Sequence, residues 1–327
     1  MIPNSANPTQ GSALGPGAEF DRIRGIMRLL GNRSAGLGDD CGLIREGDVF
    51  FALSTDVSVE QVHFRLEWIG LEEVGWRATA AALSDLAAEG AEPVGLLSAV
   101  TVPSAAGEPE LLELMSGVGA AAGFARAPVL GGDLSTGPVW SLAITVVGRT
   151  RAPITRAGAQ PGDRLWVTGA LGGARAALEA WKRNEVPSSE ARARFAHPEP
   201  RIAAGRWLVR HGAHAMIDLS DGLGGDARHL AAASGVQVEI DLETLPIAAG
   251  VPAEAERRRI SPGEFAAEAG EDYELLVALP SRFDGPDEFV RECGIGLTRI
   301  GSVGEGSGAR FLSAGREIGL KGFDHFG

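Results

Sequence analysis

Apolar positions in the first half of the chain follow helical and strand periodicities in turn. Phe20, Ile23 and Met27 recur at intervals of three and four, which predicts a helix over 19–30. The alternation of elements predicts one α/β unit that ends near residue 149. The other predicted segments of this half are helices over 71–90 and 107–125 and strands over 48–59, 94–102, 128–134 and 139–149.

A second unit follows a stretch rich in proline, glycine and polar residues over 151–165. Its strands and helices interleave, so we expect an α/β or α+β fold with two domains and mixed sheets. The expected division is a disordered tail over 1–18, an N-terminal domain over 19–150 and a C-terminal domain over 151–327. The predicted segments are helices over 173–183, 199–211 and 223–234 and strands over 164–169, 215–220, 236–242, 273–279, 297–303 and 309–313.

The composition is typical of a globular protein without a membrane span. Of the 327 residues, 44% are hydrophobic and 22% are charged, and no apolar run approaches the ~18 residues needed to cross a bilayer. The first twenty residues have neither the basic nor the apolar region of a signal peptide, so we expect a cytoplasmic location. The net charge of −13 repels phosphate backbones and argues against a nucleic-acid partner.

The basic and sulfur-containing residues narrow the chemistry further. Lys182 and Lys321 are the only lysines, and the sequence lacks the G-x-x-x-x-G-K-[ST] phosphate-binding motif. A bound polyphosphate would therefore be neutralised by arginine or by metal ions. Cys41 and Cys293 lie far apart without a paired ligand spacing, which argues against a disulfide or a thiolate metal site.

Aspartates follow the ends of four apolar runs, and a fifth lies inside a helical pattern. Each of the four has a simple alternative role as a helix cap, because Asp at a helix start accepts backbone N–H groups. Asp85 differs, since Asp is a poor helix former and is costly to bury without a partner. Five such positions together favour a shared role. The segments are Gly38-Asp39-Asp40-Cys41, Ser54-Thr55-Asp56, Leu83-Ser84-Asp85-Leu86, Gly131-Gly132-Asp133 and Asp218-Leu219-Ser220-Asp221.

The residue types in these segments favour a magnesium site. No histidine or cysteine accompanies the aspartates at ligand spacing, so the ligands would be oxygen atoms. Such ligands favour Mg²⁺, Mn²⁺ or Ca²⁺ over zinc, and Mg²⁺ above the others. Two carboxylates 4 Å apart repel by about 4 kcal/mol at an effective dielectric constant of 20, so cations or protons must offset their charge. Because bound Mg²⁺ often contacts substrate phosphates, the pattern indicates a phosphorylated ligand.

Nine segments, taken in order, resemble the thiamine-monophosphate kinase family of the aminoimidazole-ribonucleotide-synthetase-like superfamily. The resemblance extends from about residue 19 to the C-terminus, and the pair IDLSDG and GEDYEL is specific. It implies two α/β domains, with the N-terminal halves of two chains paired into a β-barrel across a homodimer. The segments are GDDCG (38–42), STD (54–56), His63, LSDLAAEGA (83–91), GGD (131–133), TRAGAQPGD (155–163), IDLSDGL (217–223), GEDYELL (270–276) and KGFDHF (321–326).

The resemblance also implies a reaction and a set of site residues. The reaction is in-line transfer of the γ-phosphoryl group of MgATP to thiamine monophosphate, without a side chain as catalytic base, in thiamine diphosphate biosynthesis. Several Mg²⁺ ions would be bound by Asp40, Ser54, Thr55, Asp56, Asp85, Asp133, Asp218 and Asp221. ATP would contact Gly132, Asp133, Arg156 and Ser220, and thiamine phosphate would contact His63, Glu271 and Phe323.

Two other functions are compatible with the residues. One is another ATP-using synthetase of the superfamily, such as aminoimidazole-ribonucleotide or selenophosphate synthetase. The latter would need a cysteine or selenocysteine near a lysine before residue 38, and the sequence has neither there. The other is a non-catalytic scaffold in which bound metal only stabilises the fold. A scaffold would bind metal without nucleotide, whereas a kinase would bind Mg²⁺ weakly until ATP arrives.

Overall fold

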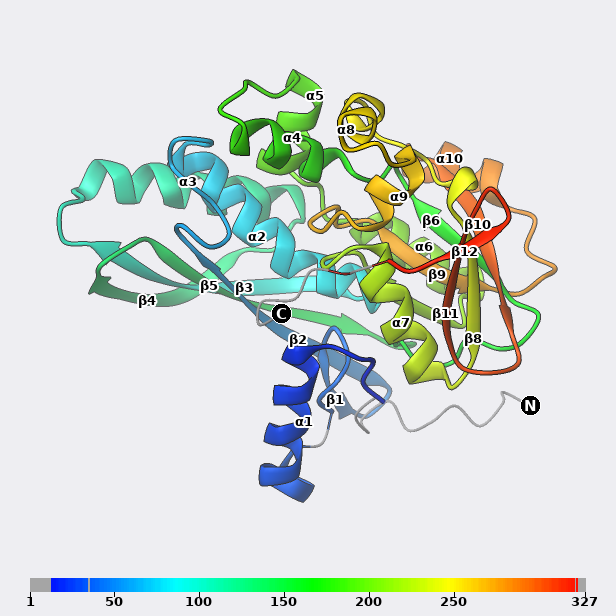
Figure 1. Ribbon diagram of the computed structural model, residues 1–327. Helices are drawn as coiled ribbons and strands as arrows, with labels where there is room; N and C mark the ends of the chain where they lie inside the picture. The colour runs from blue at the N-terminus through cyan, green and yellow to red at the C-terminus, as the bar shows by residue number, and fades with distance from the viewer. Residues whose placement is uncertain (1–12, 35, 321, 323–327) are drawn as a thin grey trace.

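The described part of the chain forms two β-sheets, one from each half, with helices packed on both (Figure 1). In the computed structural model, residues 13–34, 36–320 and 322 are described. Helices of the first half cover one face of the first sheet, and helices of the second half surround the second sheet. Both sheets contain parallel and antiparallel pairs, so the predicted fold class, α/β with mixed sheets, is confirmed.

Within the described residues, the first sheet has five strands. β3 and β4 are parallel, and the other neighbouring pairs are antiparallel. One face packs against α2 (Leu71–Ala88), which in turn packs against α3 (Glu108–Phe124). The strands lie in the spatial order β1 (Gly42–Glu46), β2 (Val49–Val59), β5 (Ser141–Thr150), β3 (Glu92–Pro103) and β4 (Val129–Gly137).

Strand alternation divides the polar residues of β2 between the two faces of this sheet. Asp56 lies opposite Ile144 of β5, whose side chain is fully buried in the core beneath α2, and Ser54 shares that face. Thr55 points the other way, where its hydroxyl group hydrogen-bonds that of Thr145 at 2.9 Å. Ser54 and Asp56 therefore face the helices, whereas Thr55 lies on the exposed outer face.

The outer face and the edges of the first sheet expose apolar side chains and backbone. Val57 and Leu97 are 49% and 43% exposed, and Leu130 and Leu134 of β4 are 60% and 63% exposed. β1 pairs only with the first half of β2. Within the described residues, the second half of β2, 54–59, therefore pairs with β5 on one side and with no strand on the other. β4 is the other edge strand of this sheet, and within the described residues no strand pairs with its outer edge.

The second sheet has seven strands within the described residues, and it is most deeply buried at β7 and β9. Every residue of β9 is buried, which is typical of a strand with helices on both sides. Leu275 and Val277 pack with Trp207, whereas Leu276 and Ala278 belong to the main core. The strand order is β12 (Arg316–Ile318), β11 (Gly308–Ser313), β8 (Gln237–Asp241), β10 (Leu297–Gly304), β6 (Arg164–Thr168), β9 (Leu275–Leu279) and β7 (Ala215–Asp218).

The remaining helices include one that projects from the body, α1 (Ala18–Leu30), which buries no side chain (Figure 1). None of the helices in the described ranges is both long and apolar enough to cross a membrane. The others are α4 (Gly173–Lys182), α5 (Ser189–Ala196), α6 (Ile202–Arg210), α7 (Leu223–Ser234), α8 (Val251–Arg258), α9 (Pro262–Ala267), α10 (Pro286–Cys293) and two 3₁₀ turns, Gly31–Arg33 and Leu242–Thr244.

The long periodic segments were predicted well, and the short ones were missed. The helices expected at 71–90 and 223–234 appear as α2 and α7 with nearly the same bounds. The sequence did not predict β1, β12, α5, α8, α9 or α10. The four missed helices span six to eight residues. That is shorter than the window of about 11–18 residues over which an apolar period becomes visible.

Two glycines set the spacing between α2 and α3. A Cβ atom at Gly75 would lie 2.0 Å from the Leu114 carbonyl oxygen, and one at Gly117 would lie 1.8 Å from the Glu72 carbonyl oxygen. Both distances are far below any van der Waals contact, so the two backbones approach this closely only because glycine stands at both crossing points. The crossing fixes the helix that carries Asp85.

We expect Gly117→Ala to lower the melting temperature, because the added methyl group must push α3 away from α2. Overpacking of this kind typically costs about 1–3 kcal/mol of the free energy of unfolding. Gly119→Ala in the same helix is the matched control, since no atom lies within 4 Å of its Cβ position. Its better helix propensity should leave the melting temperature equal or higher. Scanning calorimetry that found the same shift in both variants would contradict this account.

Candidate functional site

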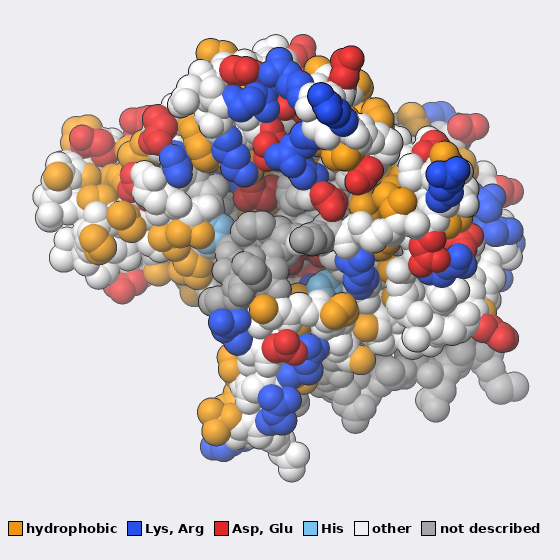
Figure 2. Space-filling model, in the orientation of Figure 1, with side chains coloured by type: hydrophobic (Ala, Val, Ile, Leu, Met, Phe, Trp, Pro, Cys, Tyr) orange, Lys and Arg blue, Asp and Glu red, His pale blue; other side chains and the backbone are white. Residues whose placement is uncertain are grey.

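A cavity of about 820 Å³ opens where elements of the two halves meet. One wall comes from the end of β2, from α2, and from the segments that follow β7 and precede β9. The opposite wall comes from α4 and α8. Figure 2 shows Lys and Arg side chains gathered above the hollow, over the region of α4 and α8. The cavity thus joins segments that are far apart in the sequence.

Three aspartates meet at one end of this cavity, and two of them, Asp85 and Asp218, line it. Asp40 closes the glycine-rich loop before β1, Asp85 lies near the end of α2, and Asp218 is the last residue of β7. One carboxylate oxygen of each lies within 4.8 Å of the other two. The structure therefore brings together three residues that the sequence predicted as metal ligands.

Burial and mutual repulsion make these carboxyl groups hard to ionise. Burial, reinforced by the charge of Asp40, raises the pKa of Asp218 to about 8. Burial raises the pKa of Asp40 to about 6, although the Arg156 cation acts in the opposite direction. The pKa of Asp85 is well above its usual value because of burial and of the charges of Asp56 and Asp218. The negative charge of the cluster thus destabilises the site, and a bound cation would offset it.

Further polar groups extend the cluster along the cavity. The Ser54 hydroxyl donates a hydrogen bond to Asp85 Oδ2, and Asp56, whose pKa burial raises to about 6, lines the same cavity. Asp221 lines it too, and its backbone N–H donates to Asp226 Oδ2 at 3.2 Å. Asp226 was not predicted, because an acid in the first turn of a helix is ordinary. Burial, with Asp221 nearby, raises the pKa of Asp226 well above its usual value.

Arg156 is a buried cation held within the acidic cluster. Its Nε donates to Asp40 Oδ1 at 3.2 Å, and Nη2 binds the same oxygen. Its backbone N–H donates to Asp39 Oδ1 at 3.1 Å, so Asp39, which was not predicted as a site residue, also contributes. The predicted contact of Arg156 with ATP stays a prediction; in this structure its guanidinium group orients Asp40.

The donor set of this cluster fits Mg²⁺. The three carboxylates and the Ser54 hydroxyl offer only oxygen atoms, which hard divalent cations prefer. Asp40 Oδ2 is buried and has no hydrogen-bond partner among the described residues. A buried carboxylate oxygen without a partner is costly, and coordination to a cation would satisfy it.

His63 and Glu271 line the cavity beyond the acidic cluster. His63 Nδ1 accepts the Val59 N–H at 3.0 Å, so the neutral ring carries its proton on Nε2. The Glu271 N–H donates to the Ser220 carbonyl oxygen at 2.7 Å, which ties Glu271 to the segment that follows β7. Ser220 lines the cavity as well. The third residue predicted to contact thiamine phosphate, Phe323, lies outside the described residues.

Thr55, Gly132 and Asp133 lie away from this cluster within the same chain. Asp133 of β4 aligns with Val57 of β2 across the two strands between them. Three strand spacings, about 14 Å in all, therefore separate these positions. Gly132 has a packing role, because a Cβ atom there would lie 1.8 Å from the Ser98 carbonyl oxygen. The predicted ligand set is thus divided between a buried cluster and the outer part of the sheet.

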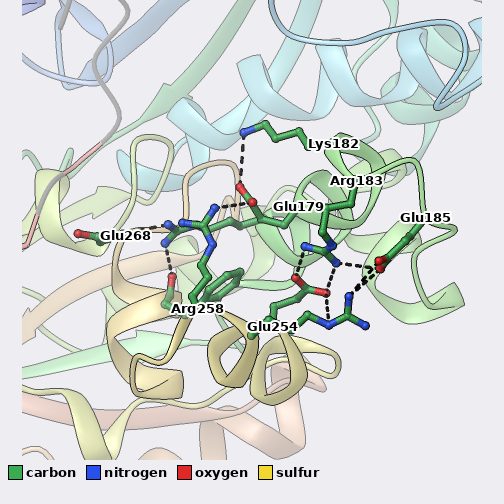
Figure 3. A network of polar contacts seen from close by, with 10 residues as sticks. Glu179, Lys182, Arg183, Glu185, Glu254, Arg258 and Glu268 are labelled. Atoms are coloured by element: carbon green, nitrogen blue, oxygen red, sulfur yellow. Dashed lines mark hydrogen bonds and ion pairs between the residues drawn. The ribbon is translucent and has the colours of Figure 1, made fainter.

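Charged pairs line the wall formed by α4, α8 and the segment that precedes β9 (Figure 3). Glu179 lies between two cations, Lys182 at 3.4 Å and Arg258. Arg175 pairs with Glu268 at 3.5 Å. Glu179 and Glu268 on this wall therefore each have a cationic partner.

Two family models match the chain. They describe the N-terminal domain of AIR synthase related proteins, matched over residues 38–150, and the C-terminal domain of the same proteins, matched over 160–312. Solved HypE hydrogenase maturation proteins share the fold, with a TM-score of 0.75 at 16% identity for the HypE–HypF complex. Identity this low indicates only a common architecture.

Closer relatives share a single activity. The chain is 34% identical over 320 residues to the thiamine-monophosphate kinase of Mycobacterium tuberculosis, which covers 96% of this chain and 92% of the relative. It is 35% identical over 324 residues to that of Escherichia coli, with 94% and 95% covered. The solved structure of AaThiL complexed with AMPPCP and TMP aligns with a TM-score of 0.84 at 32% identity, over 94% of this chain and 97% of that one. Similarity at this level along nearly the whole chain shows that it belongs to the thiamine-monophosphate kinase family.

Proposed function

We propose that the chain transfers the γ-phosphoryl group of ATP to the phosphate of thiamine monophosphate and releases thiamine diphosphate and ADP. The cavity carries this proposal, because one end presents clustered carboxylates and the rest offers room for an organic acceptor. It also unites Ser220, expected to contact ATP, with His63 and Glu271, expected to contact the acceptor. The relative solved with AMPPCP and TMP supports both ligands.

The reaction depends on positioning and charge neutralisation more than on a base, because the acceptor phosphate is already anionic. An acceptor oxygen bonds to the γ-phosphorus as the bond from that phosphorus to the bridging oxygen breaks, and ADP leaves with the electron pair. Asp40, Asp85 and Asp218 would hold Mg²⁺, which would supply positive charge to offset the polyphosphate. Arg156 keeps the Asp40 carboxylate in place.

A coupled assay of ADP release tests the function. We expect release that requires both thiamine monophosphate and Mg²⁺. Release that is unchanged without thiamine monophosphate would contradict the kinase proposal and favour another ATP-using reaction. Tight Mg²⁺ binding without nucleotide, measured by calorimetry and unaccompanied by turnover, would instead favour a metal-stabilised scaffold.

We also propose that the active form is a homodimer closed through the free strand edges. An unpaired edge exposes backbone N–H and C=O groups and is normally covered. The edges at 54–59 and β4 lie beside exposed apolar side chains such as Leu130. Pairing β4 of one chain with 54–59 of the other would join the two sheets into a barrel. It would also bring the partner's Asp133 beside Thr55 and Asp56.

Mixed dimers test whether the two chains share each site. Asp56→Asn and Asp133→Asn should each reduce kcat by more than about tenfold, equivalent to ~1.4 kcal/mol, because each removes a charged ligand. In a heterodimer of the two variants, one site regains both aspartates and the other loses both. With statistical subunit exchange, roughly a quarter of the wild-type activity should return on mixing.

The matched control mixes Asp56→Asn with Asp85→Asn. Both residues belong to the helix-facing side of one chain, so their heterodimer should contain no intact site and should recover nothing. A lack of recovery with Asp133→Asn as well, in dimers confirmed by native mass spectrometry, would assign Asp133 to its own chain. A monomer in sedimentation experiments would overturn the homodimer.

The metal-free protein should lose stability as the pH rises. The pKa of Asp218 is about 8 in the folded chain against a usual value of 3.8, so between these pH values the folded state binds a proton that the unfolded state has released. The free energy of unfolding therefore falls with rising pH across this window. Asp85→Asn removes a carboxyl group that burial and neighbouring charges make costly to ionise, so it should raise the melting temperature in EDTA at pH 8 and flatten the decline.

Ligand gives a second readout: MgATP at a hundredfold excess over Kd adds about 2.7 kcal/mol to wild-type stability. The gain should be smaller in Asp85→Asn. Scanning calorimetry that found identical pH curves and identical MgATP gains in wild type and Asp85→Asn would remove Asp85 from the site.

A further inference from the structure

The loop that carries Arg156, residues 155–160, is held in place by side chains. From Arg156 to Gln160, every backbone N–H group donates to a side-chain oxygen atom of another described residue. The loop belongs to no helix or strand, so its conformation depends on these acceptors. The acceptors are Asp39 Oδ1 for Arg156, Thr155 Oγ1 for Ala157, Ser234 Oγ for Gly158 and Ala159, and Asp163 Oδ2 for Gln160.

One hydroxyl group, that of Ser234, makes three hydrogen bonds to this loop. Its Oγ accepts the N–H groups of Gly158 at 3.2 Å and Ala159 at 3.1 Å. It also donates to the Arg156 carbonyl oxygen at 2.9 Å. A serine hydroxyl has one donor and two acceptor lone pairs, so the loop uses its full hydrogen-bonding capacity. Removal of this one group would take a hydrogen bond from three backbone positions at once.

The loop lies between β7 and the end of α7. Ser234 is the last residue of α7, and on the other side the Met216 N–H of β7 donates to the Thr155 carbonyl oxygen at 3.0 Å. A Cβ atom at Gly158, whose φ is 127°, would lie 2.4 Å from the His214 carbonyl oxygen. Only glycine allows the loop to approach the start of β7 this closely. The Ser234 hydroxyl therefore holds a loop that already has little room to move.

Arg156 connects the position of this loop to the acidic cluster. Its backbone N–H donates to Asp39, and its guanidinium group binds Asp40 Oδ1 through both Nε and Nη2. The other carboxylate oxygen, Asp40 Oδ2, has no hydrogen-bond partner among the described residues. The contact at Oδ1 thus sets the direction in which Oδ2 points. A shift of the backbone at Arg156 would turn the Asp40 carboxylate with it.

We propose that Ser234 is a positioning residue for phosphoryl transfer, because its hydroxyl group fixes the loop from which Arg156 orients Asp40. This inference rests on the proposed function, in which Asp40 helps to hold Mg²⁺. Ser234 is not among the described residues that line the cavity or form the acidic cluster, so it acts only through the loop. Loss of its hydroxyl group weakens the hold on Mg²⁺ and changes neither the charge of the site nor the cavity wall.

The Mg²⁺ dependence of ADP release in Ser234→Ala tests this role. We expect the Mg²⁺ concentration that gives half the maximal rate to rise by roughly fivefold or more, the size expected for lost hydrogen bonds. KM for thiamine monophosphate should be nearly unchanged, because the cavity wall is intact.

Ser188→Ala is the matched control. Ser188 Oγ also accepts a backbone N–H, that of Ala191 at 3.2 Å, where it caps α5, and Ser188 is not among the residues that line the cavity. Its loss should lower the melting temperature and leave the Mg²⁺ dependence unchanged. The same change of Mg²⁺ dependence in both variants would indicate a general loss of stability and would overturn the role of Ser234.

A double variant shows whether Ser234 acts through Arg156. Arg156→Ala alone should raise the Mg²⁺ requirement. Adding Ser234→Ala should then raise it by less than about twofold further, because residues that act in series are not additive. If the two single effects multiply in the double variant, Ser234 does not act through Arg156 and the inference is wrong.

Hydrogen exchange measured by mass spectrometry gives a readout independent of turnover. In protein without Mg²⁺ or nucleotide, the peptide that covers 156–160 should exchange faster in Ser234→Ala than in wild type, because two amides lose their acceptor. Equal exchange, or an unchanged Mg²⁺ dependence, would overturn this inference and leave the kinase proposal intact. Wild-type protein that releases no ADP with thiamine monophosphate would overturn the function itself, whatever the exchange shows of the loop.

Discussion

Repulsion among buried carboxylates is the constraint around which the rest of this structure is arranged. Asp40, Asp85 and Asp218 come from a loop, a helix and a strand end, so only the tertiary fold brings them together. Packing elsewhere must offset the repulsion. The end of α2 supplies Ala87 and Ala88 to the same apolar cluster as Trp207 of the second half. Burial of this shared core stabilises the contact between the two halves at the position where the acids meet. The free energy of apolar burial thus offsets the repulsion between the carboxylates.

The packing of α2 sets the position of Asp85. This helix is buried against the first sheet and against α3, and its Ala81 and Asp85 line the cavity. Its placement depends on the close contact at Gly75 and Gly117. A rigid helix is well suited to hold a carboxyl group in place against the repulsion of neighbouring acids.

What the sequence could reveal depended on whether a residue was unusual in its local context. Asp85 was predictable because an acid inside an apolar helical pattern needs a partner. Asp226 and Ser234 gave no such signal, since an acid or a serine in a helix is ordinary until the fold shows what it contacts. The contact of Ser234 with the loop at 155–160 joins two segments through tertiary packing alone, which no local pattern encodes. The short helices α8 and α9 were missed for a related reason: their stability comes from the core and not from their own periodicity.

The division of Ser54, Thr55 and Asp56 between two faces follows from the two-residue period of a strand, and it explains why adjacent residues can serve different purposes. Ser54 and Asp56 reach the acidic cluster because their register with β5 matches buried side chains. A shift of one residue would move Asp56 to the outer face and Thr55 into the core. In the proposed dimer, the outer face is the one that meets the partner, so a single strand supplies polar groups both to its own buried cluster and to the junction between chains. Among the residues that the structure describes, one edge of 54–59 has no strand partner, as expected of a site that a second chain completes.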